Sequence, residues 1–260
     1  MKRRTGWLVV LGLLAVAAFA LATLPAVVLT GTLARAGLTA TALSGSIWSG
    51  TAHGLAWNGA GLGDLDWTLA PVRLLSGRAA GHARLVRADG SLDTDYDVGL
   101  FGQDVRLTGT TFALPVQALE ALPLGMPRGW RGMAKGALDE VHVADRWPVA
   151  VRGKLDLEGL VSPAMRDAPL GNFQVLVPHP QPKPSLSIPA DPRNLTAKVR
   201  DQDGPFAVDG QLTLSPARGF SLEGTLAPRG PVPPNVERVL QLLGPADASG
   251  RREFSVGGSL

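Results

Sequence analysis

Short stretches of alternating apolar and polar residues follow one another from about residue 38 to the end of the chain. Three clear cases are DLDWTL at 64–69, SLDTDYDVGL at 91–100 and KLDLEGL at 154–160. An alternation of period two is typical of a strand that buries one face. Asp89-Gly90, just before the second stretch, has the composition of a hairpin turn. The pattern therefore predicts a mainly β body built on an antiparallel sheet.

Glycine recurs inside these stretches, in phrases of the form apolar-x-Gly-x-apolar. Glycine weakens a strand unless it marks a bulge or a close approach of two backbones. Its regular use predicts a curved and strongly twisted sheet. The phrases are LSGSI, LTGTTF, VRGKL, VDGQL, LEGTL and VGGSL.

Two segments have helical spacing instead, at 114–124 and 233–244. In the second, Pro233 and Pro234 mark a start and Gly244 a stop. Each segment follows a similar strand and precedes a glycine-containing one, so we predict two short helices and interpret the arrangement as a weak internal duplication. Residues 177–192 carry six prolines and are predicted to form a loop or edge segment.

An uncharged, apolar run extends from Trp7 to Leu29, after Lys2, Arg3 and Arg4. Its length suits a bilayer-spanning helix, and the preceding positive charge favours a cytoplasmic N-terminus. A cleaved signal peptide is the alternative, because small residues near 18–22 offer cleavage patterns. We favour a retained anchor because the run is longer than a signal requires. The predicted organisation is a head at 1–6, a transmembrane helix at 7–29 and an exported β domain at 30–260.

The charge of the body is balanced. The chain has 25 basic and 22 acidic residues, and three of the basic ones lie at positions 2–4. A body without a basic stripe argues against nucleic-acid binding. The sequence contains no cysteine, which excludes disulfides, thiolate zinc sites, a cysteine nucleophile and a lipidated N-terminal cysteine.

The four histidines are dispersed along the sequence. None has a second ligand at a spacing typical of metal sites, and the segment EVHVAD places one of them in a strand between two valines. We interpret them as structural residues. They are His53, His82, His142 and His179.

Asp93, Asp95 and Asp97 reproduce the opening of a calcium-binding loop, with Asp104 at its twelfth position. The sixth position of such a loop is glycine, and here it is Val98; the twelfth is a bidentate glutamate. Because alternation places the first three carboxylates on one face of a strand, we favour a solvated strand face over a calcium site.

Asp64 and Asp66 project on the same side of a strand and could act as paired carboxylates in a hydrolase. Any amphipathic strand produces the same spacing, so we interpret the pair as structural. The sequence predicts no catalytic, cofactor-binding or metal residues and no enzymatic activity.

The stretch LSGSIWSGTAHGLAWNG at 43–59 combines serines, a histidine and tryptophans. Without a third group to orient them, the serines and His53 do not make a catalytic triad. We interpret the stretch as the first hairpin of the body and predict that its two tryptophans and Trp67 stack along one sheet face. The serines concerned are Ser44, Ser46 and Ser49, and the two tryptophans are Trp48 and Trp57.

Four segments carry a resemblance to a known family, and together they span most of the body. The chain resembles type II secretion system protein N. The segments are LSGSIWSGTA at 43–52, LGDLDWTLAPVRLLSGRAAG at 62–81, PLGNFQVLV at 169–177 and VERVLQLLGPADASGRREFSVGGSL at 236–260.

The resemblance implies a single-pass protein of the Gram-negative inner membrane, with its N-terminus in the cytoplasm and its body in the periplasm. It implies a non-enzymatic component that takes part in the export of folded proteins from the periplasm across the outer membrane, with other type II secretion components as partners and no cofactor. A fainter likeness to AsmA-like proteins implies the alternative of a lipid-handling module with an apolar groove.

Overall fold

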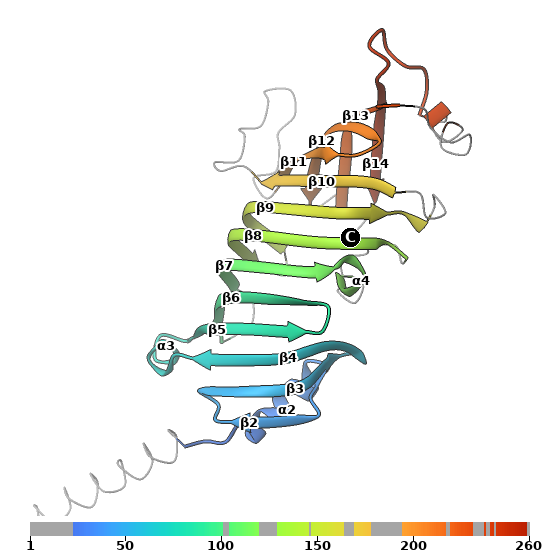
Figure 1. Cartoon of the computed structure of the whole chain (residues 1–260). Coiled ribbons are helices and arrows are strands. Elements are labelled where there is room, and N and C mark those ends of the chain that lie inside the picture. Colours follow the sequence, from blue (N-terminus) through green and yellow to red (C-terminus); the bar gives the residue numbers. More distant parts are fainter. Residues whose placement is uncertain are drawn as a thin grey trace, which may run out of the picture.

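The computed structural model describes residues 23–100, 104–119, 129–145, 147–163, 169–177, 194–216, 219–230, 237, 240–241 and 243–258. These residues form one antiparallel sheet of 14 strands (Figure 1). The strands are β1 Leu38–Thr39, β2 Ala42–Gly45, β3 Ser49–Trp57, β4 Ala60–Leu69, β5 Arg78–Arg87, β6 Gly90–Gly99, β7 Asp104–Pro115, β8 Arg131–Ala144, β9 Trp147–Val161, β10 Pro169–Val177, β11 Leu195–Asp203, β12 Phe206–Ser215, β13 Gly219–Pro228 and β14 Arg252–Gly258.

From β3 to β14 each strand pairs with the next one in the sequence, while β1 and β2 both pair with β3. The alternating segments at 64–69, 91–100 and 154–160 fall in β4, β6 and β9. The predicted antiparallel β body is therefore confirmed, as is the first hairpin, in which Gly45 of β2 faces Gly50 of β3.

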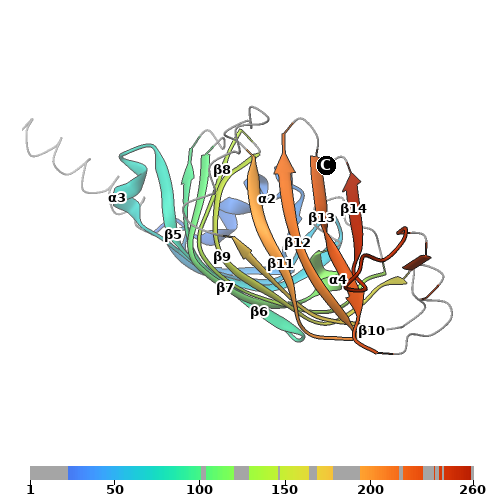
Figure 2. The same cartoon turned by 90° about the horizontal axis from the view of Figure 1, so that it is seen from above.

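The sheet is curved along its strands (Figure 2). Two of the bends coincide with glycines in the left-handed region, Gly54 in β3 and Gly109 in β7, each with a φ of 58°. Both lie where the register to the neighbouring strand shifts. A left-handed residue in a bulge adds local bend and twist to its strand. The prediction that glycines mark a curved sheet is thus confirmed.

Other glycines make room for an aromatic ring from the neighbouring strand. A Cβ added to Gly136 would lie 2.2 Å from the ring of Phe112, and one added to Gly50 would lie 2.6 Å from the ring of Trp67. An aromatic side chain over a cross-strand glycine shields the exposed backbone and pins the register. Glycine is therefore required at these positions by space.

The described helices are short: η1 Ala26–Leu29, α2 Thr30–Arg35, α3 Pro71–Leu74 and α4 Val116–Leu119. The first helix was predicted at 114–124, but residues 114–115 end β7, so the predicted start is two residues too early. The helix α4 covers 116–119, and residues 120–124 lie outside the described residues. In the second, Glu237 and Leu240–Gln241 are helical. The helices α2 and α3 were not predicted, because they are too short to show helical periodicity.

Both predicted helical segments connect neighbouring strands, β7 to β8 and β13 to β14. Each contributes a buried apolar side chain, Val116 at 1% exposure and Leu240 at 5%. In both places, a strand is followed by a short helical segment and then by the next strand of the sheet. Two copies do not establish a repeat, so the duplication stays a prediction.

The outer end of the apolar run at 7–29 belongs to the folded body. Pro25 forms a bridge with Ser46, and the N–H of Ile47 donates to the carbonyl of Leu24 at 3.0 Å. Ala26 is 1% exposed. Apolar side chains suit both lipid and a protein surface, so the run at 7–29 includes residues that pack on the body, and the transmembrane helix predicted at 7–29 stays a prediction.

None of the helices within the described residues is long and apolar enough to span a bilayer. Residues 1–22, which include most of the predicted anchor, lie outside the described residues, as does the proline-rich segment apart from Val177, the last residue of β10.

Candidate functional site

One face of the sheet is apolar from end to end. Registered cross-strand pairs link one residue of each strand from β2 to β14 into a continuous row that contains only apolar residues and glycine. At a strand spacing of about 4.8 Å the row extends on the order of 60 Å. The row runs Leu43, Ala52, Leu65, Leu85, Leu92, Phe112, Gly136, Leu155, Val175, Val199, Gly210, Gly224, Phe254.

The adjacent row, whose side chains project to the opposite face, is polar apart from Ala137 and Leu176. It consists of Ser44, Thr51, Asp66, Arg84, Asp93, Thr111, Ala137, Lys154, Leu176, Lys198, Gln211, Glu223, Ser255. Successive residues of a strand point to opposite faces, so the two rows show a sheet with one apolar and one polar side.

The apolar row lies on the inside of the curve. The helical segment that contains Leu240 packs on Phe206 and Val208, whose side chains share the face of the apolar row. Figure 2 shows α2 and α4 on the inner side of the sheet as well. We therefore call the apolar side the concave face and the polar side the convex face.

Among the described residues, other elements cover the concave face only in places. Near the C-terminal end, Phe206 and Leu240 are each 5% exposed within a buried cluster. Near the N-terminal end, Trp67 donates from Nε1 to the carbonyl of Ile47 at 3.1 Å, which holds the turn between β2 and β3 next to this face. Between these ends, Leu85, Leu92 and most other residues of the row are only partly buried. The middle of the concave face is therefore a partly exposed apolar surface.

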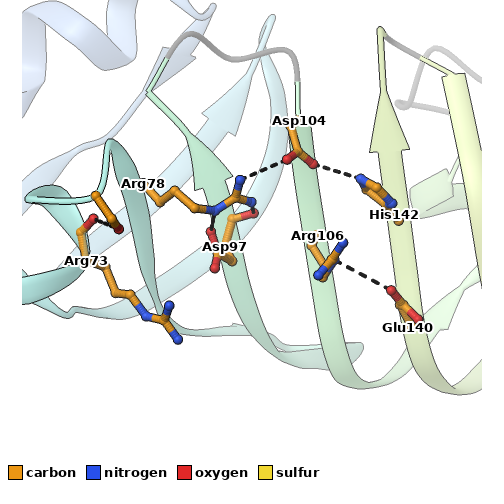
Figure 3. A network of polar contacts seen from close by, with 8 residues as sticks. Arg73, Arg78, Asp97, Asp104, Arg106, Glu140 and His142 are labelled. Atoms are coloured by element: carbon orange, nitrogen blue, oxygen red, sulfur yellow. Dashed lines mark hydrogen bonds and ion pairs between the residues drawn. The ribbon is translucent and has the colours of Figure 1, made fainter.

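A network of charged groups joins four strands on the convex face (Figure 3). Arg78 of β5 pairs with Asp97 of β6 and donates from Nη1 to Asp104 of β7 at 2.8 Å. Asp104 also contacts Nε2 of His142 of β8 at 2.8 Å. The hydrogen bond from Arg78, followed by that from His142, lowers the pKa of Asp104. The network ties neighbouring strands together across the sheet surface.

No motif or spacing in the sequence predicts this network. The residues that pair in this network are separated by 19 to 38 positions in the sequence, so only the strand register brings them together. Beside it, Arg106 and Arg152 both approach Glu140, at 3.6 Å and 3.1 Å. Polar alternation indicated the convex face, but no spacing in the sequence indicates which charges meet.

The carboxylates considered for calcium lie on the convex face, as expected. His82 of β5 contacts Asp95 through Nδ1 at 2.9 Å and Asp93 through Nε2 at 3.3 Å. Asp97 and Asp104 pair with Arg78. The structure therefore pairs these carboxylates with basic side chains of neighbouring strands instead of gathering them around one point.

Asp64 and Asp66 also lie on the convex face. Asp64 accepts from the backbone N–H of Gly54 at 2.8 Å and contacts Nδ1 of His53 at 3.3 Å, while Asp66 accepts from the hydroxyl of Thr51 at 2.6 Å. The hydrogen bond from Gly54, followed by that from His53, lowers the pKa of Asp64. A general acid needs a raised pKa, so this arrangement suits a structural carboxylate.

The serines of the opening hairpin have local structural roles. The hydroxyl oxygen of Ser46 accepts from the backbone N–H groups of Trp48 and Ser49, each at 3.2 Å, which closes the turn between β2 and β3. Ser44 donates to the carbonyl of Thr51 at 3.5 Å. Their partners are backbone groups of the hairpin. His179, the fourth histidine, lies outside the described residues.

The predicted stack of three tryptophans is wrong. Trp48 lies in the turn between β2 and β3, and Trp67 faces Gly50 at the start of β3. Trp57 ends the same strand and donates to the carbonyl of Ala36 at 3.2 Å. At a rise of about 3.3 Å per residue, the seven residues from Gly50 to Trp57 cover about 23 Å. The regular spacing reflects hairpin length, and Trp57 binds the backbone at Ala36 while Trp67 binds the turn between β2 and β3.

His82 makes stability depend on pH. Its hydrogen bond to Asp95 raises its pKa, so this pair stabilises the fold fully below the unfolded value near 6.5 and is lost as pH rises through the higher folded value. We expect the melting-temperature advantage of the wild type over His82→Gln to be larger at pH 5.5 than at pH 8.5. Because the side chain is 44% exposed, the gain should stay below about 1 kcal/mol.

Salt provides the control for this pH experiment. At about 1 M salt, screening should reduce the pH-dependent difference between the two proteins. A difference that is equal at both pH values, or that salt leaves unchanged, would show that the pair contributes no charge interaction.

Comparison with known proteins identifies relatives that cover most of the chain. The family model described as "Type II secretion system (T2SS), protein N" matches residues 36–255. Type II secretion system protein N of Vibrio cholerae serotype O1 is 26% identical over 230 residues, which are 86% of this chain and 86% of that protein. The protein of the same name from Aeromonas hydrophila is 28% identical over 217 residues, covering 80% of this chain and 79% of that protein. No solved structure matches.

Proposed function

The chain belongs to the type II secretion system protein N family, and we propose that it is a non-enzymatic inner-membrane component of the type II secretion system that takes part in the export of folded proteins from the periplasm across the outer membrane. The observation that carries the proposal is the extent of the match, which begins before β1 and ends inside β14. The shared region thus includes every strand from β1 to β13 and the first part of β14.

The proposed topology is a single membrane anchor with the sheet in the periplasm. Because Leu24 and Pro25 contact the body, the anchor extends from Trp7 to Thr23. Its length of about 17 residues is at the lower end of what spans a bilayer. The basic residues at 2–4 favour a cytoplasmic N-terminus.

The proposal of a non-enzymatic role is supported by the contacts of the residues considered for catalysis. Asp64 pairs with His53 and accepts from the backbone N–H of Gly54 on an exposed strand surface, and Ser46 closes a turn. The polar groups of the convex face connect strands. Such a surface suits a scaffold that holds its shape and contacts other proteins.

The free edge of β14 is the contact that we propose for another secretion component. Among the described residues β14 pairs with β13 alone, and Val256 on this edge is 52% exposed. An incoming strand can bind such an edge through backbone hydrogen bonds and continue the sheet. The short pairing of β1 and β2 at the other end offers a smaller edge.

Export by a strain that lacks the gene tests the role. We expect a secreted enzyme of that bacterium to accumulate in the periplasm, and the wild-type gene to restore its release. Val256→Lys, which places a charge on the free edge, should restore less, while Val86→Lys should restore fully because Val86 is similarly exposed, at 42%, within the interior strand β5.

Two results would contradict this proposal. Undiminished release of the enzyme from the deletion strain would oppose a role in export. Equal restoration by Val256→Lys and by the wild type would oppose binding at the β14 edge. Melting temperatures of both variants should equal that of the wild type, since both side chains are exposed.

The concave face favours a second candidate function, the handling of lipids. Its apolar row crosses the whole sheet and is only partly covered, so acyl chains would find a continuous apolar surface of on the order of 60 Å. Native mass spectrometry of the full chain, released from detergent, should then show lipid-bound species. A protein free of lipid after gentle extraction would oppose this function.

A further inference from the structure

An exposed apolar patch lies on one rim of the sheet, where α3 connects β4 to β5. Leu75 is 89% exposed, Val72 75% and Leu100, at the end of β6, 56%. The N–H of Leu100 donates to the carbonyl of Gly77 at 3.0 Å, which joins the β6 end to the α3 turn. Three large apolar side chains that face solvent together mark a contact surface. We call Val72, Leu75 and Leu100 the rim patch.

The rim patch lies close to the point where the described chain begins. The N–H of Leu69, two residues before α3, donates to the carbonyl of Trp48 at 2.7 Å, and the neighbouring Ile47 donates to the carbonyl of Leu24 at 3.0 Å. Two hydrogen bonds therefore connect the base of α3 to the residue that follows the proposed anchor. Figure 1 shows α3 and the start of the described chain at the same side of the sheet.

The bilayer is the partner that this position fits. If the anchor ends at Thr23, the lipid headgroups begin within a few residues of Leu24, at the same rim as α3. Val27 and Val28 of η1, at 63% and 58% exposure, add apolar surface close to this point. Arg73 on α3 is exposed and suits anionic headgroups. An apolar surface with a basic residue is typical of segments that lie in the membrane interface.

We propose that the rim patch inserts into the outer leaflet of the membrane that holds the anchor, so that this rim of the sheet contacts the bilayer surface. This inference rests on the proposed anchor at Trp7 to Thr23. Contact at two places, the anchor and the rim patch, restrains rotation of the sheet about the anchor. The concave face of the sheet then keeps a constant orientation relative to the membrane.

Fluorescence in vesicles tests the contact. Since the chain has no cysteine, Leu75→Cys in the full-length protein can be labelled at one site with an environment-sensitive dye. The labelled protein is inserted in vesicles of phosphatidylethanolamine and phosphatidylglycerol that carry nitroxide at a shallow position of the acyl chain. We expect blue-shifted emission and at least twofold quenching, and the same for Val72→Cys.

Two control sites separate the inference from the anchor. Val86→Cys, on the convex face of β5 and 42% exposed, should be neither shifted nor quenched. Ala15→Cys, at the middle of the proposed anchor, should be quenched by nitroxide deep in the bilayer. Quenching at position 15 without quenching at position 75 would overturn the rim contact and leave the anchor standing. No quenching at position 15 would overturn the anchor and the inference that rests on it.

A protein contact in place of a lipid contact would also be visible. In that case the dye at position 75 would show a blue shift that the nitroxide lipids do not quench, and the inference would be wrong. The melting temperature of Leu75→Cys should equal that of the wild type, because the side chain it removes has almost no contacts in the fold.

Discussion

Replacing Phe206 with alanine should lower the free energy of unfolding by about 3 to 5 kcal/mol, the usual range for a phenylalanine removed from a core. Phe206 is 5% exposed and packs with Val208 and Leu240 in the cluster that covers the concave face near its C-terminal end. In a sheet of one layer, few side chains are covered both by the sheet itself and by a second element that packs on it. The loss of one of them should therefore be felt strongly in urea or thermal denaturation.

Val256→Ala is the matched control for Phe206→Ala. Val256 projects from the concave face of β14, the second neighbour of β12, but it is 52% exposed. Its replacement should change stability by less than about 0.5 kcal/mol. Equal small losses from both substitutions would show that the segment with Leu240 does not cover the concave face.

Gly81→Ala should be the most disruptive change of a single methyl group, with a loss of about 3 kcal/mol. A Cβ at this position in β5 would lie 1.8 Å from the carbonyl oxygen of Thr68 in β4. The obstacle is backbone, which cannot rotate away as a side chain can, so the two strands must separate. Overpacking of this kind costs about 1 to 3 kcal/mol and more where relaxation is blocked. The melting temperature of the purified variant measures the effect.

Gly61→Ala controls for the intrinsic effect of a methyl group in a strand. Gly61 lies in β4, and a Cβ added there would meet no heavy atom within 4 Å. The variant should melt at or slightly above the wild-type temperature, because alanine lowers the entropy of the unfolded chain. If Gly81→Ala melted like Gly61→Ala, the close approach of β4 and β5 would be refuted.

The sequence predicted the two-faced sheet because each strand carries its own pattern. Leu65, Leu92 and Leu155 each stand at an apolar position of an alternating stretch, and the structure joins them in one row. The repeated glycines predicted the curvature for a similar reason, since a glycine in a strand indicates a local bend wherever it occurs. Properties that are decided within one strand can be inferred from that strand.

Properties that depend on register could not be inferred in this way. Arg78 and His142 meet at Asp104 because three hairpins place β5, β6, β7 and β8 in a particular alignment. The regular spacing of Trp57 and Trp67 suggested a stack, yet the hairpin between them puts the rings at opposite ends of β3 and β4. Spacing along the chain indicates the length of a hairpin, but it does not indicate which residues of neighbouring strands lie side by side.

Short elements at the rim were missed although a signal was present. Pro71 stands at the first turn of α3 and Gly77, with a φ of 73°, follows it, an order typical of a helix start and stop. Four helical residues give no periodicity, so α3 was not predicted. The apolar run at 7–29 continues into contacts with the body at Leu24 and Pro25, because lipid and a protein surface both accept apolar side chains.

The order of the strands has a consequence for how the protein assembles. Beyond β3, each strand of the sheet finds its partner in the preceding stretch of chain, so no strand has to wait for a distant segment. Connections between strands that follow each other in the sequence close at low entropic cost. A fold with nearest-neighbour contacts can grow from a nucleus by adding one unit at a time. During synthesis the sheet can therefore be laid down in the order of translation, with β14 added last and its outer edge still open.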